Sequence, residues 1–162
     1  MASLLARLVR PVALSSAVAE LLLLVPRVVC GVMLTTLFGA PKFGLPWSPA
    51  EANLGFFEVA FWFPTDVAEF GGIFAVAPAL FAWLAAFAEG VGGVALVLGL
   101  AVRPFAALLL ATMSVAVIWQ QLPQGYWNAL PALGFGWVSL YLLVLGGGRW
   151  SVDAWLARRW TA

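Results

Sequence analysis

Four long runs of apolar residues, separated by short segments that contain proline, glycine and charge, make up most of the chain. The most regular run, Phe81 to Leu100, is apolar throughout except for Glu89 near its middle. A helix on a soluble protein keeps one polar face, but this run has none, so its surroundings must be lipid or other apolar helices. The pattern predicts an all-α integral membrane four-helix bundle, with residues 1–162 as one domain and spans at about 17–38, 74–102, 105–122 and 129–145.

The connections between these runs contain prolines that shape the expected helices. Pro26 in the first run removes one backbone hydrogen-bond donor. Two alternatives remain open there: a helix kinked at Pro26, or a helix that starts at Pro26 and is preceded by a separate interfacial helix. Arg103-Pro104 forms a very short connection, which predicts that the second and third spans are an antiparallel hairpin.

Two segments outside the spans are expected at the membrane surface. Residues 39–74 are the least hydrophobic stretch and predict an outer loop between the first two helices. Within this loop, Phe56 to Phe63 is aromatic and too short to span, so we expect it at the interface, with a re-entrant segment as the alternative. Residues 149–162 alternate tryptophan with arginine, which predicts an amphipathic helix with Ser151 as its N-cap.

Composition supports a membrane protein and excludes other classes. The chain is 64% hydrophobic and 9% charged, with a mean hydropathy of +1.04, whereas about a quarter of the residues in soluble domains are charged. No basic patch is large enough for nucleic acid. The chain has no histidine, and its single cysteine, Cys30, cannot form a disulfide within the chain. The sequence therefore encodes no metal-ligand set and no cofactor fingerprint, and it identifies no catalytic residue.

The basic residues predict the orientation of the chain. In a four-span protein, the residues that fall on one side are Arg7, Arg10, Arg103, Arg149, Arg158 and Arg159, while Lys42 and four acids fall on the other. The positive-inside rule then places both termini in the cytoplasm. Arg7 and Arg10 before an apolar run also resemble a signal peptide. Because Pro26 and Arg27 interrupt that run, we expect it to remain as a span of a multi-pass protein in the bacterial inner membrane.

Glu89 and Arg27 are the charges expected deepest in the membrane. From the predicted boundaries, Glu89 lies about 20 Å and Arg27 about 15 Å from the cytoplasmic ends of their helices, within reach of one arginine side chain. Intramembrane charges usually pair, so we predict an Arg27–Glu89 ion pair. Such a pair either handles protons or substrate, or only fixes the register of the helices.

A second candidate site lies at the outer side. Lys42, at the end of the first span, and the residues around the third connection, Gln120, Gln121, Tyr126 and Trp127, could line a pocket there. A quinone suits an apolar slot with a few hydrogen-bond donors. The alternatives are a polar cap with an interfacial aromatic belt, and a Lys42 that extends to the interface or pairs with Asp66 or Glu69.

Several motifs in order resemble the DoxX family. They are Arg27-Val28-Val29-Cys30-Gly31, Gly39-Ala40-Pro41-Lys42, Ala88-Glu89-Gly90-Val91-Gly92-Gly93 with Leu98-Gly99-Leu100 and Arg103, Leu122-Pro123-Gln124-Gly125-Tyr126, and Gly148-Arg149-Trp150-Ser151-Val152-Asp153. The resemblance implies a four-helix membrane fold. This chain differs from many relatives in its long aromatic loop and in having no histidine near Gln120.

The resemblance also implies a function. Some members of the family are membrane subunits of a thiosulfate:quinone oxidoreductase, and others associate with enzymes that handle thiols and oxidants. We therefore expect an accessory or quinone-interacting subunit of a membrane redox system, with lipid and other membrane proteins as partners and a quinone as the candidate bound cofactor. The alternatives are a structural subunit without chemistry and a small-solute carrier, for which the chain has few polar residues.

Overall fold

The computed structural model describes residues 10–160, so Arg7 and the last two residues of the expected tail lie outside the described part. Within residues 10–160, four helices are long and apolar enough to cross a membrane, which confirms the predicted helical membrane bundle. The first combines α2 (Ala17–Met33) with η1 (Leu34–Gly39), and the second is α5 (Pro78–Leu98). The third combines α6 (Val102–Val115), η3 (Ala116–Gln121) and η4 (Leu122–Gln124), and the fourth is α7 (Tyr126–Leu145).

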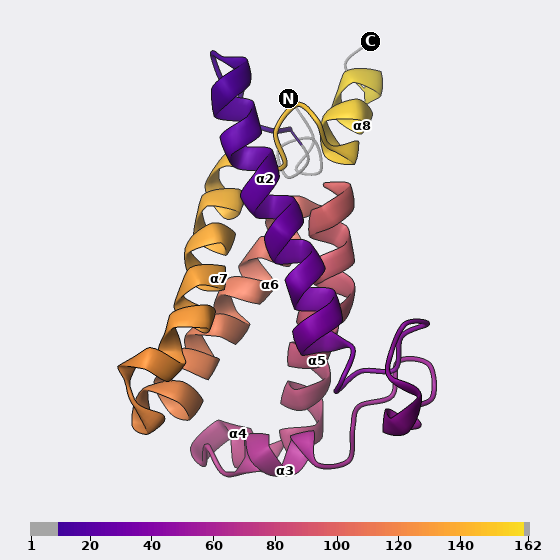
Figure 1. Cartoon of the computed structure of the whole chain (residues 1–162), viewed down its shortest axis with the longest axis vertical. Coiled ribbons are helices and arrows are strands. Elements are labelled where there is room, and N and C mark those ends of the chain that lie inside the picture. The colour runs from indigo at the N-terminus through magenta and orange to yellow at the C-terminus, as the bar shows by residue number, and fades with distance from the viewer. Residues whose placement is uncertain (1–9, 161–162) are drawn as a thin grey trace.

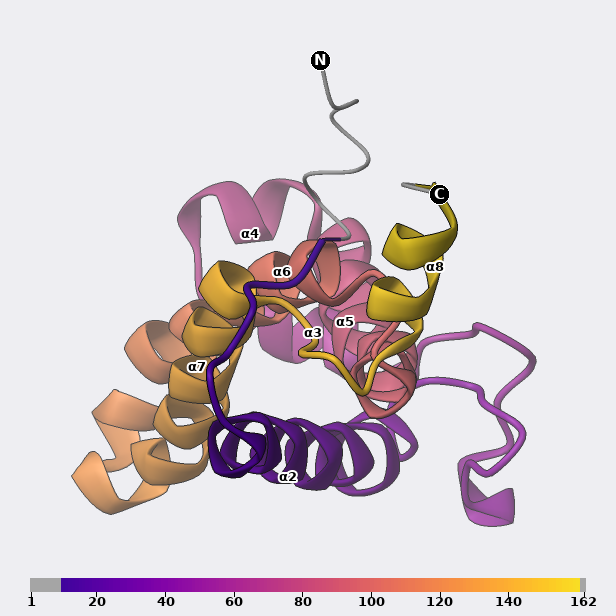
Figure 2. The ribbon, with the colours of Figure 1, turned by 90° about the horizontal axis from the view of Figure 1, so that it is seen from above.

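The short elements lie at the two ends of this bundle (Figure 1). One end, here called the loop end, holds η2 (Ala50–Ala52), α3 (Phe63–Ala68) and α4 (Gly72–Val76). The other end, here called the terminal end, holds residues 10–16 and α8 (Val152–Trp160). Seen along the bundle, α2 and α6 lie on opposite sides, with α5 and α7 between them (Figure 2).

Glycines set the close approach of α2 and α5. A Cβ atom placed at Gly93 would lie 2.7 Å from the carbonyl oxygen of Gly31, and one placed at Gly39 would lie 2.6 Å from the Cα atom of Gly90. Small residues allow membrane helices to pack backbone against backbone, because no side chain separates them. These contacts fix the register of the two helices, with Gly39 opposite Gly90 near the loop end.

Several helix boundaries differ from the sequence prediction. Pro26 lies inside a continuous helix, Ala17–Met33, so the alternative of a helix that starts at Pro26 is wrong. The second helix begins at Pro78, four residues later than expected, and ends at Leu98, four residues earlier than expected. Residues 99–101 connect it to α6. Arg103-Pro104 therefore lies in the first turn of α6, where a missing backbone donor does no harm. The fourth helix begins at Tyr126, which places Pro131 within it.

The outer loop folds back onto α5 and buries part of its aromatic content. Phe43 is fully buried and packs in a cluster with Phe63, Val67, Ala82 and Ala86, and Phe43 forms an isolated antiparallel bridge with Val59. Other aromatic residues of the loop face outward, since Phe56 and Phe61 are exposed. The loop thus covers the loop end of α5 and places Lys42 beside that helix.

Candidate functional site

The central feature of the site is an ion pair between Lys42 and Glu89. The Lys42 Nζ atom lies 2.6 Å from the Glu89 Oε2 atom, and the two side chains are 15% and 6% exposed. Lys42 follows the end of η1, and Glu89 lies on the face of α5 that meets it. The Lys42 ammonium also sits over the ring of Phe63, 4.6 Å from its centroid. The expectation that Glu89 faces inward with a cationic partner is confirmed, but the partner is Lys42.

The predicted Arg27–Glu89 pair is therefore wrong. Arg27 is fully buried at the terminal end, where its Nη2 atom donates a hydrogen bond to the carbonyl oxygen of Trp150 at 2.9 Å and its Nη1 atom lies against Gly99. Gly99 is ten residues from Glu89 along α5, a separation of about 15 Å. The prediction assumed that the helix ends are level, whereas α2 extends well beyond the end of α5 (Figure 1).

The Lys42–Glu89 pair forms the polar wall of a cavity of about 330 Å³ at the loop end. The other lining residues are mostly apolar and come from α3, the turn after it, α4, α5, α6 and η3: Phe63, Val67, Phe70, Ile73, Phe74, Phe81, Leu84, Ala85, Leu108, Ala111, Thr112, Val115, Ala116 and Gln120. Ile73 and Ala111 are also exposed, so the cavity is open to the surface. Its chemistry combines aromatic surface with one cation, one carboxyl group and one amide.

The predicted outer pocket is only partly assembled. Lys42 and Gln120 line the cavity together, but Gln121, Tyr126 and Trp127 do not. Tyr126 and Trp127 are 82% and 85% exposed at the loop end, so their inclusion in the pocket is wrong. An aromatic residue at the start of a membrane helix can face either the bundle or the surroundings, and no element within residues 10–160 covers these two rings.

Sequence reasoning also missed the aromatic wall of the cavity. The rings of Phe70, Phe74 and Phe81 pack edge to face in sequence, with centroids 5.8 Å and 5.0 Å apart. The sequence signal is the number of aromatic residues in the loop. Aromatic residues beside a span also indicate the membrane surface, which is the position that we expected for them. Thr112 and Gln120, spaced eight residues apart on one helical face, were a second signal for the same wall.

The buried charges at the terminal end have structural partners. The Asp153 carboxylate accepts hydrogen bonds from the backbone N–H groups of Ala101 at 2.8 Å and Val102 at 2.9 Å, which caps the start of α6. Burial raises the pKa of the Asp153 carboxyl group, while the two N–H groups and nearby Arg27 act in the opposite direction. Ser151 caps α8 as predicted, because its Oγ atom accepts from the N–H of Ala154.

Glu20 completes this arrangement. Its Oε2 atom accepts a hydrogen bond from the backbone N–H of Arg149 at 2.9 Å. Arg27 and Glu20 thus hold the segment between α7 and α8, and Asp153 joins α8 to the start of α6. These hydrogen bonds define the architecture of the terminal end.

The fold and the buried pair define the chain as a multi-pass helical membrane protein with a small polar site. Comparison with known protein families matches residues 22–122 to the DoxX family, and the chain belongs to that family. The matched segment includes Arg27, Lys42, Glu89 and Gln120, whereas α7 and α8 follow it. No curated protein and no solved structure matches the chain.

Proposed function

We propose that this protein binds a quinone in the cavity at the loop end and serves as an accessory subunit of a membrane redox system. The observation that carries the proposal is the Lys42–Glu89 pair at one wall of an otherwise apolar, aromatic cavity of about 330 Å³. Small-molecule sites of this size are typically apolar with a few polar groups that fix orientation.

The chemistry of the lining suits a quinone ring. A quinone is flat and apolar, and its two carbonyl oxygens accept hydrogen bonds. The Lys42 ammonium and the Gln120 amide can donate to such oxygens, and the rings of Phe74 and Phe81 offer surfaces for contact with a planar ring. The opening near Ile73 and Ala111 would let an apolar tail extend toward lipid.

A redox role would require electrons from elsewhere. The cavity is lined by lysine, glutamate, glutamine, threonine and hydrocarbon side chains, none of which exchanges electrons at biological potentials. The protein would therefore bind and orient the quinone, and a partner subunit would supply or accept the electrons. The Lys42–Glu89 pair could exchange a proton with a quinone oxygen, since a carboxyl group beside an ammonium can donate and accept protons.

We also propose that the terminal end faces the cytoplasm of a bacterial inner membrane. The arginines of the described chain that cluster at or near this end are Arg10, Arg103, Arg149, Arg158 and Arg159, and the loop end holds Glu51, Glu58, Asp66 and Glu69. The positive-inside rule favours this orientation. The cavity would then lie in the outer half of the membrane.

The test is the quinone content of the purified protein. Protein isolated in mild detergent is extracted with organic solvent, and the quinone is measured by chromatography per mole of protein. Ala111→Trp fills the mouth of the cavity and should lower the quinone content at least fivefold. Ser114→Trp is the matched control, because Ser114 lies on the same helix but outside this cavity, and it should retain quinone.

The same measurement separates the redox proposal from its competitor. If wild-type protein carries no quinone in any detergent, or if Ala111→Trp and Ser114→Trp retain equal amounts, the proposal is wrong. Co-purification of stable partner proteins without quinone would then favour a structural subunit of a larger membrane complex.

A further inference from the structure

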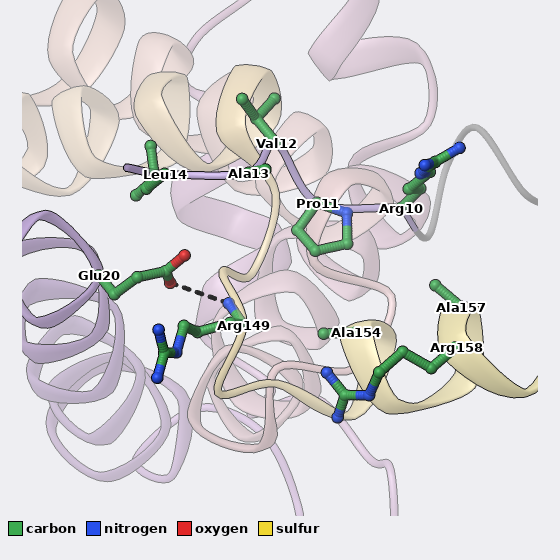
Figure 3. Close-up of a pocket in the computed structure, with 10 residues that line it drawn as sticks. All are labelled: Arg10, Pro11, Val12, Ala13, Leu14, Glu20, Arg149, Ala154, Ala157 and Arg158. Carbon is green, nitrogen blue, oxygen red and sulfur yellow. Dashed lines mark hydrogen bonds between the residues drawn. The ribbon is translucent and has the colours of Figure 1, made fainter. Parts of the chain in front are cut away.

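A second cavity, of about 330 Å³, lies at the terminal end between residues 10–14, α2 and α8 (Figure 3). It is separate from the quinone site, which is at the loop end. Its polar lining is basic, with three arginines and one glutamate, and its remaining walls are small or apolar. The polar lining residues are Arg10, Arg149, Arg158 and Glu20.

Two of the three arginines lie on the same side of this cavity. Arg149 belongs to the segment between α7 and α8. Its backbone N–H donates to Glu20 at 2.9 Å, and its guanidinium lies over the ring of Trp150, 5.1 Å from the centroid. Arg158 extends from α8 toward the side where Arg149 lies, and Arg10 is at the opposite rim (Figure 3). A guanidinium group presents several N–H donors in a fixed geometry, which suits the oxygens of a phosphate group.

The single carboxylate in the cavity does not cancel this positive charge. Glu20 is 3% exposed, and its Oε2 atom already accepts the Arg149 hydrogen bond. Among the lining residues that the structure describes, three are arginines and one is a glutamate, so this lining is net positive. An anion with several oxygen acceptors is therefore the ligand that the cavity favours.

An apolar groove continues from this cavity along the bundle. The groove has a volume of about 420 Å³ and lies between α2 and α7, with Leu14, Ala19, Leu142 and Leu145 among its lining residues. Leu14 lines both the basic cavity and the groove. The segment that carries Leu14 is anchored to α7, since the N–H of Val12 donates to the carbonyl oxygen of Leu145 at 2.9 Å.

From these neighbouring features we infer a site for an anionic phospholipid, with its phosphate between Arg149 and Arg158 and an acyl chain in the groove between α2 and α7. A free phosphate ion would use the arginines alone, whereas a phospholipid uses both the arginines and the groove. Trp150, which follows Arg149, and Trp155 on α8 are half-exposed, which is typical of tryptophan at the membrane interface, where a lipid headgroup lies. Basic pockets beside membrane helices bind anionic headgroups in this way.

The test measures lipid binding to the purified full chain by native mass spectrometry. Phosphatidylglycerol and phosphatidylcholine with identical acyl chains are titrated separately, and sn-glycerol 3-phosphate is added as a soluble competitor. We expect one phosphatidylglycerol to bind in preference to phosphatidylcholine. Arg149→Gln and Arg158→Gln should each weaken its binding about fivefold, which corresponds to about 1 kcal/mol per basic residue near a membrane surface.

Two further variants separate this site from general surface charge. Arg159→Gln removes the same charge from the same helix, but Arg159 stacks over Trp155 at 4.0 Å and does not line the cavity, so binding should change less than twofold. Ala19→Phe narrows the groove without touching an arginine and should also weaken binding.

Three results would overturn the inference. The first is equal binding of phosphatidylcholine and phosphatidylglycerol. The second is an effect of Arg159→Gln as large as that of Arg158→Gln. The third is displacement of the lipid by an equal concentration of sn-glycerol 3-phosphate, which would show that a soluble phosphate suffices. Arg158 lies on an exposed face of α8, so its variant remains informative if Arg149→Gln does not fold.

Discussion

Replacing Lys42 by methionine leaves the Glu89 side chain, which is 6% exposed, without its cation. Loss of one partner from a buried ion pair destabilises a protein by about 3–5 kcal/mol, while replacing both partners is close to neutral. We expect about 3 kcal/mol for Lys42→Met, at the low end of that range, because the carboxyl group can take up a proton and limit the loss. The double variant Lys42→Met/Glu89→Gln should recover at least half of the stability that Lys42→Met loses.

The assay is unfolding in mixed micelles with increasing sodium dodecyl sulfate, followed by the fluorescence of the nine tryptophans. The control is a second cycle in which Arg27→Met is combined with Glu89→Gln. Arg27 contacts Gly99, about 15 Å from Glu89, so these two changes should be additive within about 0.5 kcal/mol. A coupling energy for Arg27 and Glu89 that exceeds the one for Lys42 and Glu89 would refute the reasoning.

Three further predictions follow from the packing, the cap and the charge distribution. Gly93→Ala should destabilise the protein by about 2 kcal/mol or more, because its Cβ would lie 2.7 Å from the Gly31 carbonyl oxygen, whereas Gly134→Ala, with nothing within 4 Å, should be neutral or stabilising in the same unfolding assay. Asp153→Ala should cost about 1–3 kcal/mol, since the part-buried N–H of Ala101 and the buried N–H of Val102 at the start of α6 lose their acceptor, and the exposed Glu51→Ala should cost less than about 0.5 kcal/mol. In a Cys30→Ala background, a membrane-impermeant maleimide applied to intact cells should label Glu51→Cys and not Arg159→Cys, and the reverse pattern would contradict the proposed orientation.

The sequence was sufficient for the helices and for the inward position of Glu89. A run of twenty residues that is apolar except for one acid can form few structures in a membrane. In lipid, an unpaired charge and backbone groups without hydrogen bonds both cost much free energy, so the run must be a helix with the acid turned inward. The partner of that acid could not be found in the same way. To decide whether Arg27 or Lys42 is the partner of Glu89, one must know how deep the first and second membrane helices lie relative to each other. The glycine contacts between these two helices set that depth, and they are seen only in the three-dimensional structure.

The cavity was also only partly predictable. Lys42 and Gln120 were identified as polar residues near the outer ends of their helices, and they do line one cavity. Its aromatic wall depends on how residues 40–77 fold back against α5, which hydrophobicity alone does not determine. Phe63 and Phe61 show the difficulty, because two aromatic residues in the same short run are 8% and 91% exposed.

The central claim is that the cavity beside Lys42 and Glu89 holds a quinone, and photo-crosslinking tests it most directly. An azido-quinone is bound to the purified wild-type protein and irradiated, and the labelled peptides are identified by mass spectrometry with unlabelled quinone as competitor. The account predicts competed labels on the segments that line the cavity, in α5 between Phe81 and Glu89 and in the third span between Leu108 and Gln120. Labels confined to α7, or labelling that unlabelled quinone does not reduce, would contradict it.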